Sequence, residues 1–208
     1  MRHHTLTLAL ATLLQVQPLI FEVDLWPEEG RPVFEAAGQP LQLRATPSLS
    51  APIVATQSIQ AGRRVMFDQT LYRTTRAGAF NVLKTSEIIG RDLGNVTRLN
   101  KADYYSAKFP QLSVSVNPGE TIEYLQYRAE GTCFIRIRSR VVDAELCPNQ
   151  QPDRFRTLRE PTTEWWIHLT VSKSVVGWVP VSDGTVKEID RQGESQPNPQ
   201  MEPARAGQ

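Results

Sequence analysis

Short stretches of alternating hydrophobic and polar residues, separated by turn residues, fill the chain from residue 41 onward. They lie at 41–45, 53–59, 65–67, 79–83, 121–127, 134–140, 164–171 and 177–181. Alternation with a period of two predicts strands that bury one face, and many short strands broken by Gly and Pro favour a small sandwich or barrel. The pattern therefore predicts an all-β protein.

Other stretches lack this alternation. Residues 21–40 predict an irregular lead-in with one short strand at 33–35, and residues 90–110 predict a connector with a turn of helix. Residues 148–163 are rich in Pro, Gln, Asp and Arg, which predicts an exposed excursion. Residues 191–208 have no apolar period and predict a disordered tail.

The chain also matches itself weakly. Residues 62–67 and 119–124 share Gly, an aliphatic residue and an aromatic residue in the same order, and three further short matches follow in sequence. Ordered matches at a nearly constant offset indicate two related β-units. We place the first unit at 41–100 and the second at 101–190, with an insertion at 143–163 in the second.

The N-terminus has the composition of a secretory signal peptide. Arg2 is the only Lys, Arg, Asp or Glu among residues 1–20, and an apolar run from Leu6 to Leu14 follows it. This pattern predicts a signal peptide at 1–20 and a periplasmic or secreted protein, although no clear cleavage motif precedes Phe21. The run is too short to span a bilayer. The alternative is a buried first strand or helix of a cytosolic protein.

The sequence has only two cysteines, Cys133 and Cys147, and an even number agrees with the prediction that the protein is exported. An even pair in an exported chain predicts one disulfide, here closing a loop of about 15 residues. The alternative is two reduced cysteines in the core of a cytosolic protein.

Charge and composition exclude several classes of function. Lys plus Arg number 23 and Asp plus Glu 22, so the net charge of +1 lacks the basic excess of a protein that binds nucleic acid with its whole surface. Of three histidines, only His168 lies beyond residue 20, which leaves no His-rich zinc site. The sequence predicts no metal and no cofactor.

Catalytic motifs are equally sparse. The sequence has neither a phosphate-binding loop nor a G-x-S-x-G nucleophile turn. A Cys133–His168 dyad is conceivable only if Cys133 is a free thiol, and a structural or surface role for His168 fits the pattern better. We therefore expect no enzyme.

Two sequence stretches resemble a bacterial SH3-like domain. Leu43 to Ser48, then Ala51 to Val54 and Ala61 to Val65, resemble its opening Arg-x-x-Pro-Ser turn and the strands after it. Glu164 to Leu169 and Gly177 to Val181 resemble its closing hairpin with a Gly-Trp-Val strand. The resemblance implies two SH3-like barrels in tandem. Because each half lacks part of the pattern, one barrel split by an insertion at 84–118 is the alternative.

The resemblance also implies a binding role toward cell-wall peptidoglycan or an envelope protein. Candidate ligand-binding residues are the aromatic and Arg side chains of the second unit: Trp165, Trp166, Trp178, Tyr124, Tyr127, Arg136 and Arg138. Aromatic rings beside guanidinium groups suit a stem peptide, a glycan or a Pro-rich segment. The alternative is that the rings fill the cores. A second hypothesis for function is a periplasmic adaptor or inhibitor that binds its partner through exposed loops such as 148–163.

Overall fold

The computed structural model describes residues 20–26, 31–106, 108–172 and 175–189, so the predicted signal peptide (apart from Ile20) and the predicted tail lie outside the described residues. Nearly all regular structure in these ranges is β-strand, which confirms the all-β prediction. The strands form two seven-stranded sheets, A and C, and a three-stranded sheet B. Within the described residues each sheet runs from one edge to the other without closing into a barrel.

The strand orders place sequence-distant segments side by side. Sheet A has the order β4 (Ile53–Gln57), β3 (Leu41–Arg44), β16 (Val175–Pro180), β15 (Thr162–Ser172), β6 (Phe67–Arg76), β1 (Phe21–Val23) and β9 (Arg98–Leu99). Sheet C has the order β10 (Gln111–Val116), β8 (Ser86–Gly94), β13 (Arg140–Ala144), β12 (Cys133–Ile137), β11 (Thr121–Tyr127), β7 (Gly78–Val82) and β14 (Phe155–Arg159). Sheet B has the order β17 (Val186–Glu188), β2 (Phe34–Ala36) and β5 (Arg64–Val65).

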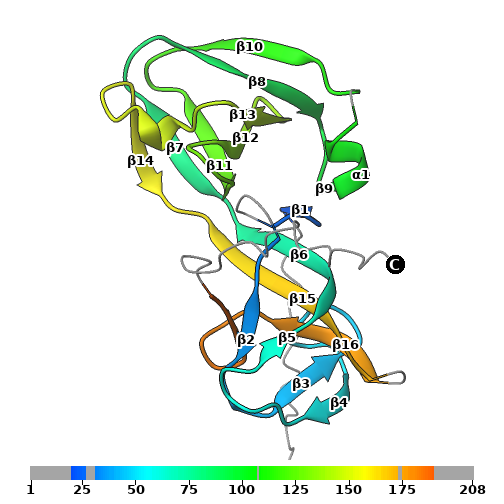
Figure 1. Cartoon of the computed structure of the whole chain (residues 1–208). Helices are drawn as coiled ribbons and strands as arrows, with labels where there is room; N and C mark the ends of the chain where they lie inside the picture. Colours follow the sequence, from blue (N-terminus) through cyan, green and yellow to red (C-terminus); the bar gives the residue numbers. More distant parts are fainter. Residues whose placement is uncertain (1–19, 27–30, 107, 173–174, 190–208) are drawn as a thin grey trace, which may run out of the picture.

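The chain therefore forms two units, one nested in the other (Figure 1). We call β2–β6 with β15–β17 the base unit, and β7, β8 and β10–β14 the insert unit. The chain passes from base to insert between β6 and β7, and returns between β14 and β15. The boundary predicted near residue 100 does not separate the sheets, because strands β3, β4 and β6 share sheet A with β15 and β16.

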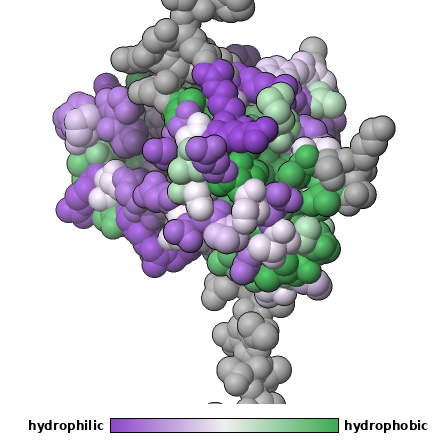
Figure 2. Space-filling model, turned by 60° about the horizontal axis from the view of Figure 1, so that its bottom comes forward, coloured by the Kyte–Doolittle hydropathy of each residue, from purple (hydrophilic) through white to green (hydrophobic). Residues whose placement is uncertain are grey.

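Each unit has its own hydrophobic core, since strand alternation sends one row of side chains inward. In the insert unit, Phe80, Ile122 and Ile135 are fully or almost fully buried. In the base unit, Phe34, Leu43 and Ile167 are fully buried. The surface at the end of the base unit mixes hydrophilic and hydrophobic areas, with hydrophobic side chains gathered toward one side (Figure 2).

A third hydrophobic cluster fills the space between the two units. Phe21 and Val23 of β1 pack there with Leu99 of β9 and Phe134 of β12. Residues 21–40 were predicted as an irregular lead-in, yet they contain β1 and β2, and β1 pairs with both β6 and β9. The short strand predicted at 33–35 corresponds to β2, which begins one residue later, whereas β1 was missed because alternation is not detectable over three positions. The predicted turn of helix in the connector is α1 (Lys101–Tyr104).

Two segments of the insert unit differ from prediction. The strand predicted at 134–140 ends at Ile137, because Arg138 and Ser139, with positive φ values of 48° and 69°, form a tight turn into β13. Consecutive positive φ values match the twist of a two-residue hairpin, but Arg and Ser are not its signature residues. The excursion predicted at 148–163 holds a 3-10 turn, η1 (Pro148–Gln150), and edge strand β14.

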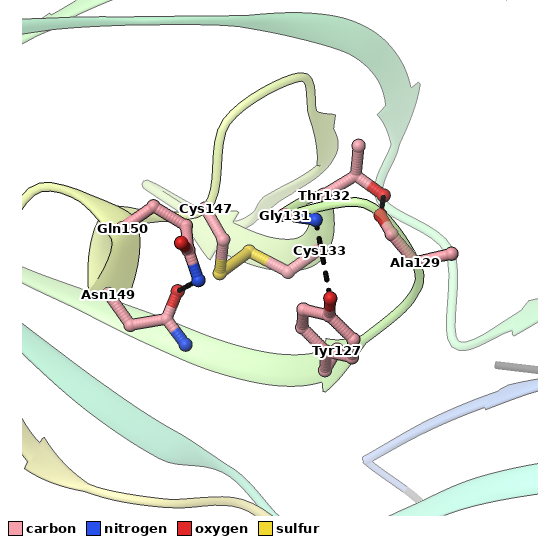
Figure 3. The surroundings of a disulfide bond; sticks show 8 residues. All are labelled: Tyr127, Ala129, Gly131, Thr132, Cys133, Cys147, Asn149 and Gln150. Carbon is pink, nitrogen blue, oxygen red and sulfur yellow. Dashed lines mark hydrogen bonds between the residues drawn. A yellow bond between two sulfur atoms is a disulfide. The ribbon is translucent and has the colours of Figure 1, made fainter. Parts of the chain in front are cut away.

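The predicted disulfide is present (Figure 3). Cys133 begins β12 and Cys147 precedes η1, with their Cα atoms 5.3 Å apart, and both residues are fully buried in the insert core. Beside the bridge, the Cys147 backbone N–H donates to the Gly131 carbonyl at 2.6 Å. The bridge thus ties the segment that leads to β14 onto the β12 strand.

Candidate functional site

One face of sheet A carries a row of polar and aromatic side chains. Paired residues on neighbouring strands point to the same face of a sheet. Arg44 pairs with Trp178, Trp178 with His168, and His168 with Gln69. Farther along, Arg73 pairs with Glu22, and Glu22 pairs with Arg98. We call this side the outer face, because the opposite side holds the base-unit core.

A cavity of about 680 Å³ opens on the outer face over β1 and β6. Its walls come from segments spread across residues 22–178, so only the tertiary structure assembles them. The lining residues are Glu22, Asp24, Trp26, Arg31, Pro47, Phe67, Asp68, Gln69, Thr70, Leu71, Arg73, Arg98, Lys101 and Trp178. A volume of this size accommodates several residues of a peptide or a small ligand.

Glu22 anchors the basic side of the cavity. Its buried carboxylate accepts hydrogen bonds from Arg73 Nε and Nη2 at 3.2 Å each, and lies 3.3 Å from Arg98 Nε. Arg73 also donates to the Pro47 carbonyl at 2.9 Å, so its guanidinium is held in place by two partners. The Arg98 side chain is 70 % exposed, which leaves most of its guanidinium facing solvent. A ligand carboxylate can therefore approach Arg98 without displacing the Glu22–Arg73 pair.

Asp24 is a carboxylate in an unfavourable position. Burial raises its pKa, although backbone N–H donors and the charges of Arg98 and Lys101 act in the opposite direction. Its Oδ1 atom is buried and has no hydrogen-bond partner in the described part of the chain. An unsatisfied buried oxygen destabilises the fold, and groups of this kind concentrate at functional sites.

Aromatic rings form the remaining walls. The Lys101 ammonium lies 4.3 Å from the centre of the Trp26 ring, and the Arg31 guanidinium lies 4.7 Å from that of Phe67. At the other end, the Trp178 ring lines the cavity and lies 5.3 Å from the ring of His168, which is not a lining residue but has its Nδ1 2.7 Å from Oδ1 of the lining residue Asp68. The cavity thus combines cations, carboxylates and flat apolar surfaces on a rigid sheet.

The three tryptophans predicted to bind ligand have different environments. Trp166 points to the outer face but is only 1 % exposed, and its indole N–H donates to Glu164 at 3.1 Å. Trp165 points to the core, where its ring lies 5.0 Å from that of Phe34. Trp178 lines the cavity. Adjacent strand residues alternate between faces, and both faces are covered at this position, so both Trp165 and Trp166 are packing residues.

The other four predicted residues lie in the insert unit. Tyr124 is buried and stacks on Phe80 at 4.8 Å, and burial raises the pKa of its hydroxyl. Tyr127 is 41 % exposed, and its hydroxyl accepts the Gly131 N–H at 3.3 Å (Figure 3). The two arginines are paired with carboxylates, Arg136 with Glu123 at 2.7 Å and Arg138 with Glu120 at 2.9 Å. The structure does not bring these four together with the tryptophans into one surface.

A second polar cluster joins α1 to sheet C. The buried Asp143 carboxylate accepts from Arg91 at 2.8 Å and from the Tyr104 hydroxyl at 2.9 Å, and Arg128 lies 3.3 Å away. Both guanidiniums lie over the Tyr104 ring, at 4.2 Å and 4.6 Å from its centre. Two guanidinium groups share one carboxylate, so the cluster carries a net positive charge, and its contacts to Tyr104 tie the connector to the insert unit.

Sequence reasoning identified only Trp178 among the residues of the cavity. Glu22, Asp24 and Trp26 lie in the segment predicted as irregular, and Arg98 and Lys101 lie in the predicted connector. The available signal was a charged and aromatic lead-in, Glu22 to Trp26, next to a hydrophobic run. That signal does not identify its partners, because most of them lie on strands far away in the sequence, such as Arg73 on β6 and Trp178 on β16.

A Cys133–His168 dyad is not formed. Cys133 is bonded to Cys147 and buried in the insert core, whereas His168 lies on the outer face of sheet A and contacts Asp68 and Trp178. A buried disulfide sulfur offers no thiolate nucleophile.

Two further findings concern the described residues only. These ranges hold no cluster of three or more His, Cys, Asp or Glu side chains arranged to bind a metal ion. They also include no helix with the length and apolar character needed to cross a membrane.

Comparison with known proteins gives no match: no family model fits the chain, and neither a curated protein nor a solved structure is recognisably similar to it.

Proposed function

We propose that this chain is a non-catalytic binding module of the cell envelope, and that it holds a peptide of the cell wall, such as a peptidoglycan stem peptide, in the cavity on the outer face of sheet A. The observation that carries the proposal is the combination of groups in one cavity: the exposed Arg98 guanidinium, the Asp24 carboxylate and the Trp26 and Trp178 rings.

The chemistry of a stem peptide suits this combination. Such a peptide presents carboxylates, an amine and short apolar side chains next to a sugar. Arg98 and Lys101 are positioned for the carboxylates, and Asp24 and Asp68 for the amine. The indoles of Trp26 and Trp178 offer flat surfaces for apolar groups or sugar rings. No bond is made or broken in this mechanism.

The position of the SH3-like sequence features supports the same proposal. The opening stretch lies on β3 and β4, and the closing hairpin is β15 and β16. These strands are neighbours in the order β4-β3-β16-β15. We infer one SH3-like base unit interrupted by the insert unit, which corresponds to the split-barrel alternative with a larger insertion than residues 84–118. Because SH3-like folds host many functions, the cavity carries more weight than the resemblance.

The test is co-sedimentation of residues 20–208 with purified peptidoglycan sacculi at low and moderate salt. We expect retention, and we expect Trp178→Ala and Arg98→Ala each to weaken it about tenfold, the size of one lost stacking or charge-assisted contact. The Arg98 variant should also lose part of the salt dependence, because it removes an exposed charge. Arg156→Ala, an exposed position on β14, is the matched control and should bind normally.

Three results would contradict the proposal. Absence of any retention rejects the cell wall as ligand. Retention that is equal in the wild type and in both cavity variants places binding elsewhere on the molecule. Retention that Arg156→Ala weakens as much as Arg98→Ala indicates a diffuse attraction to charge. Circular dichroism and thermal unfolding establish that each variant is folded.

The second candidate is a periplasmic adaptor or inhibitor. It is favoured by one observation: β14, within the segment predicted to be an exposed loop, is an edge strand whose Leu158 is 52 % exposed. Edge strands with an exposed apolar side chain can accept a partner protein. Cross-linking in an envelope extract, with wild type and Leu158→Asp, tests it; a partner captured equally by both proteins would reject this role for β14.

A further inference from the structure

A second, shallower cavity adjoins the first on the outer face of sheet A. We call it the shallow cavity, and the cavity of about 680 Å³ the main cavity. The shallow cavity has a volume of about 330 Å³, and its walls come mainly from β3, β4, β15 and β16. His168 lines it, and the same histidine contacts Trp178 and Asp68, which line the main cavity. The two cavities therefore share a wall.

Arg44 supplies the positive charge of the shallow cavity. Its guanidinium donates to the Ala51 carbonyl at 2.8 Å and to Gln42 Oε1 at 3.2 Å. Both acceptors are neutral, so these bonds hold the guanidinium in place without compensating its charge. None of the described residues that line this cavity is acidic. A guanidinium held in this way is suited to bind a carboxylate of a ligand.

Apolar side chains surround this guanidinium. Val54 and Val176 line the shallow cavity and are 54 % and 43 % exposed. Trp178 is the strand neighbour of Arg44 on the same face, and it lines the main cavity. A ligand that leaves the main cavity over this indole thus reaches an apolar surface with a cation beside it. Apolar walls with a few placed polar groups are typical of ligand sites.

Arg44 and Arg98 lie far apart on the outer face. Five steps between neighbouring strands, in the order β3-β16-β15-β6-β1-β9, separate them, which at about 4.8 Å a step is roughly 24 Å. The row of Arg44 meets β6 at Gln69 and the row of Arg98 meets it at Arg73, so the rows are offset by roughly 13 Å along the strand. A ligand that contacts both arginines must therefore span roughly 27 Å, the length of about eight residues of extended chain.

We infer that the ligand is an extended strand of the cell-wall polymer, which crosses sheet A from Arg98 over Trp178 to Arg44; this rests on the proposed function, which places its stem peptide in the main cavity. A single short peptide fills the main cavity and makes no contact with Arg44. A strand that reaches Arg44 adds a second charge-assisted contact on the same sheet, with little further loss of translational and rotational freedom. The shallow cavity is therefore a second subsite, and affinity rises with the length of the ligand.

The charges of the main cavity distinguish a wall strand from a uniform polyanion. Four basic and three acidic side chains line this cavity. A nucleic acid carries a negative charge on every unit and would meet the carboxylates of Asp24 and Asp68 as like charges. A wall strand with its stem peptides carries both carboxylates and amines, so it can present the opposite charge to each group. The mixture of signs therefore favours the wall strand.

The experiment is calorimetric titration of the protein with two soluble fragments released from purified peptidoglycan, a single repeating unit with its stem peptide and a chain of three such units. We expect the wild type to bind the three-unit chain about thirtyfold more tightly than the single unit, well beyond the roughly threefold gain that repeated copies give. Arg44→Gln should weaken binding of the chain about tenfold, the size of one charge-assisted contact, and leave binding of the single unit unchanged.

Two further variants complete the design. Val176→Asp places a carboxylate at an exposed position of the shallow cavity and should act like Arg44→Gln, so the test does not depend on the bonds that Arg44 makes to its own unit. Arg156→Gln, on an exposed position of β14, is the matched control and should bind both fragments like the wild type. Circular dichroism and thermal unfolding establish that each variant is folded.

The outcomes separate this inference from the proposed function. A wild type that binds the chain only about threefold more tightly than the single unit overturns the inference and leaves the main cavity as the whole site. Equal losses for both fragments in Arg44→Gln and Val176→Asp overturn it too, because these variants then act through the main cavity. A thymidine oligonucleotide bound as tightly as the chain overturns it in favour of a general polyanion site. If neither fragment binds, the proposed function itself fails.

Discussion

Reduction of the Cys133–Cys147 disulfide should lower the free energy of unfolding by about 3 kcal/mol. The two cysteines are 14 positions apart, and closing a loop of about 15 residues removes that much chain entropy from the unfolded state. The native state should persist, because the loop is also held by the β12–β13 ladder and by the bond from the Cys147 N–H to the Gly131 carbonyl. The loss of stability therefore comes from the greater conformational entropy of the unfolded chain once the disulfide is reduced.

The double variant Cys133→Ala/Cys147→Ala should lose more than the reduced wild type. Both residues are fully buried in the insert core, so removing the sulfur atoms leaves a small cavity in addition to the loss of the cross-link. We expect roughly 1 kcal/mol for each sulfur, giving a total loss of about 4–5 kcal/mol.

The assay is urea unfolding followed by circular dichroism, on oxidised protein, on protein refolded under reductant, and on the double variant. With a slope of about 2 kcal/mol per molar urea, the midpoint should fall by about 1.5 M on reduction. A fall of less than about 0.5 M, with the slope unchanged, would refute the loop-entropy reasoning. A fall accompanied by a changed slope would instead show that the bridge alters the compactness of the unfolded chain.

Further predictions concern single residues. Asp24→Asn should raise the melting temperature at pH 7. Burial raises the pKa of the Asp24 carboxyl in the folded state above its ordinary 3.8, so the wild type loses stability as the pH rises above about 3.8 and the carboxyl ionises. The gain should shrink near pH 3.5, and a gain of equal size at both pH values would contradict the cause. Gly90→Ala should cost on the order of 2 kcal/mol or more in urea unfolding, since its Cβ would lie 2.3 Å from the Asp143 carbonyl oxygen; an unchanged midpoint would show that β8 and β13 can separate freely. Trp166→Ala should cost about 3–5 kcal/mol and Trp178→Ala less than half of that, because only the first is fully buried. Equal losses in thermal unfolding would contradict the assignment of Trp178 to the cavity.

Local patterns were sufficient for the elements and the cross-link. Alternation at 164–171 and 177–181 predicted the two strands of the hairpin formed by β15 and β16. The pairing of Cys133 with Cys147 followed from there being only two cysteines. The hairpin depends on residues that are close in sequence, and two cysteines allow only one intramolecular pairing.

The arrangement of the strands depends on long-range pairing. Sequence alternation shows that a strand has a buried face, but not which strand lies beside it. The structure pairs β3 with β16, more than 130 positions away, and places β1 between β6 and β9. Apart from β9, which joins sheet A, the two large sheets divide the chain at residues 77 and 160–161, whereas the sequence predicted a boundary near residue 100.

The same reason separates the predicted site residues from the cavity. Seven aromatic and Arg residues in the second half of the chain were predicted to bind ligand. Six of them are buried, form ion pairs with carboxylates or, in the case of Tyr127, accept a hydrogen bond within their own unit. By itself the sequence determined the all-β class and the disulfide. Only the tertiary structure brought Glu22, Arg98 and Trp178 to one surface, because sheet pairing joins β1, β9 and β16 across a separation that no local pattern records.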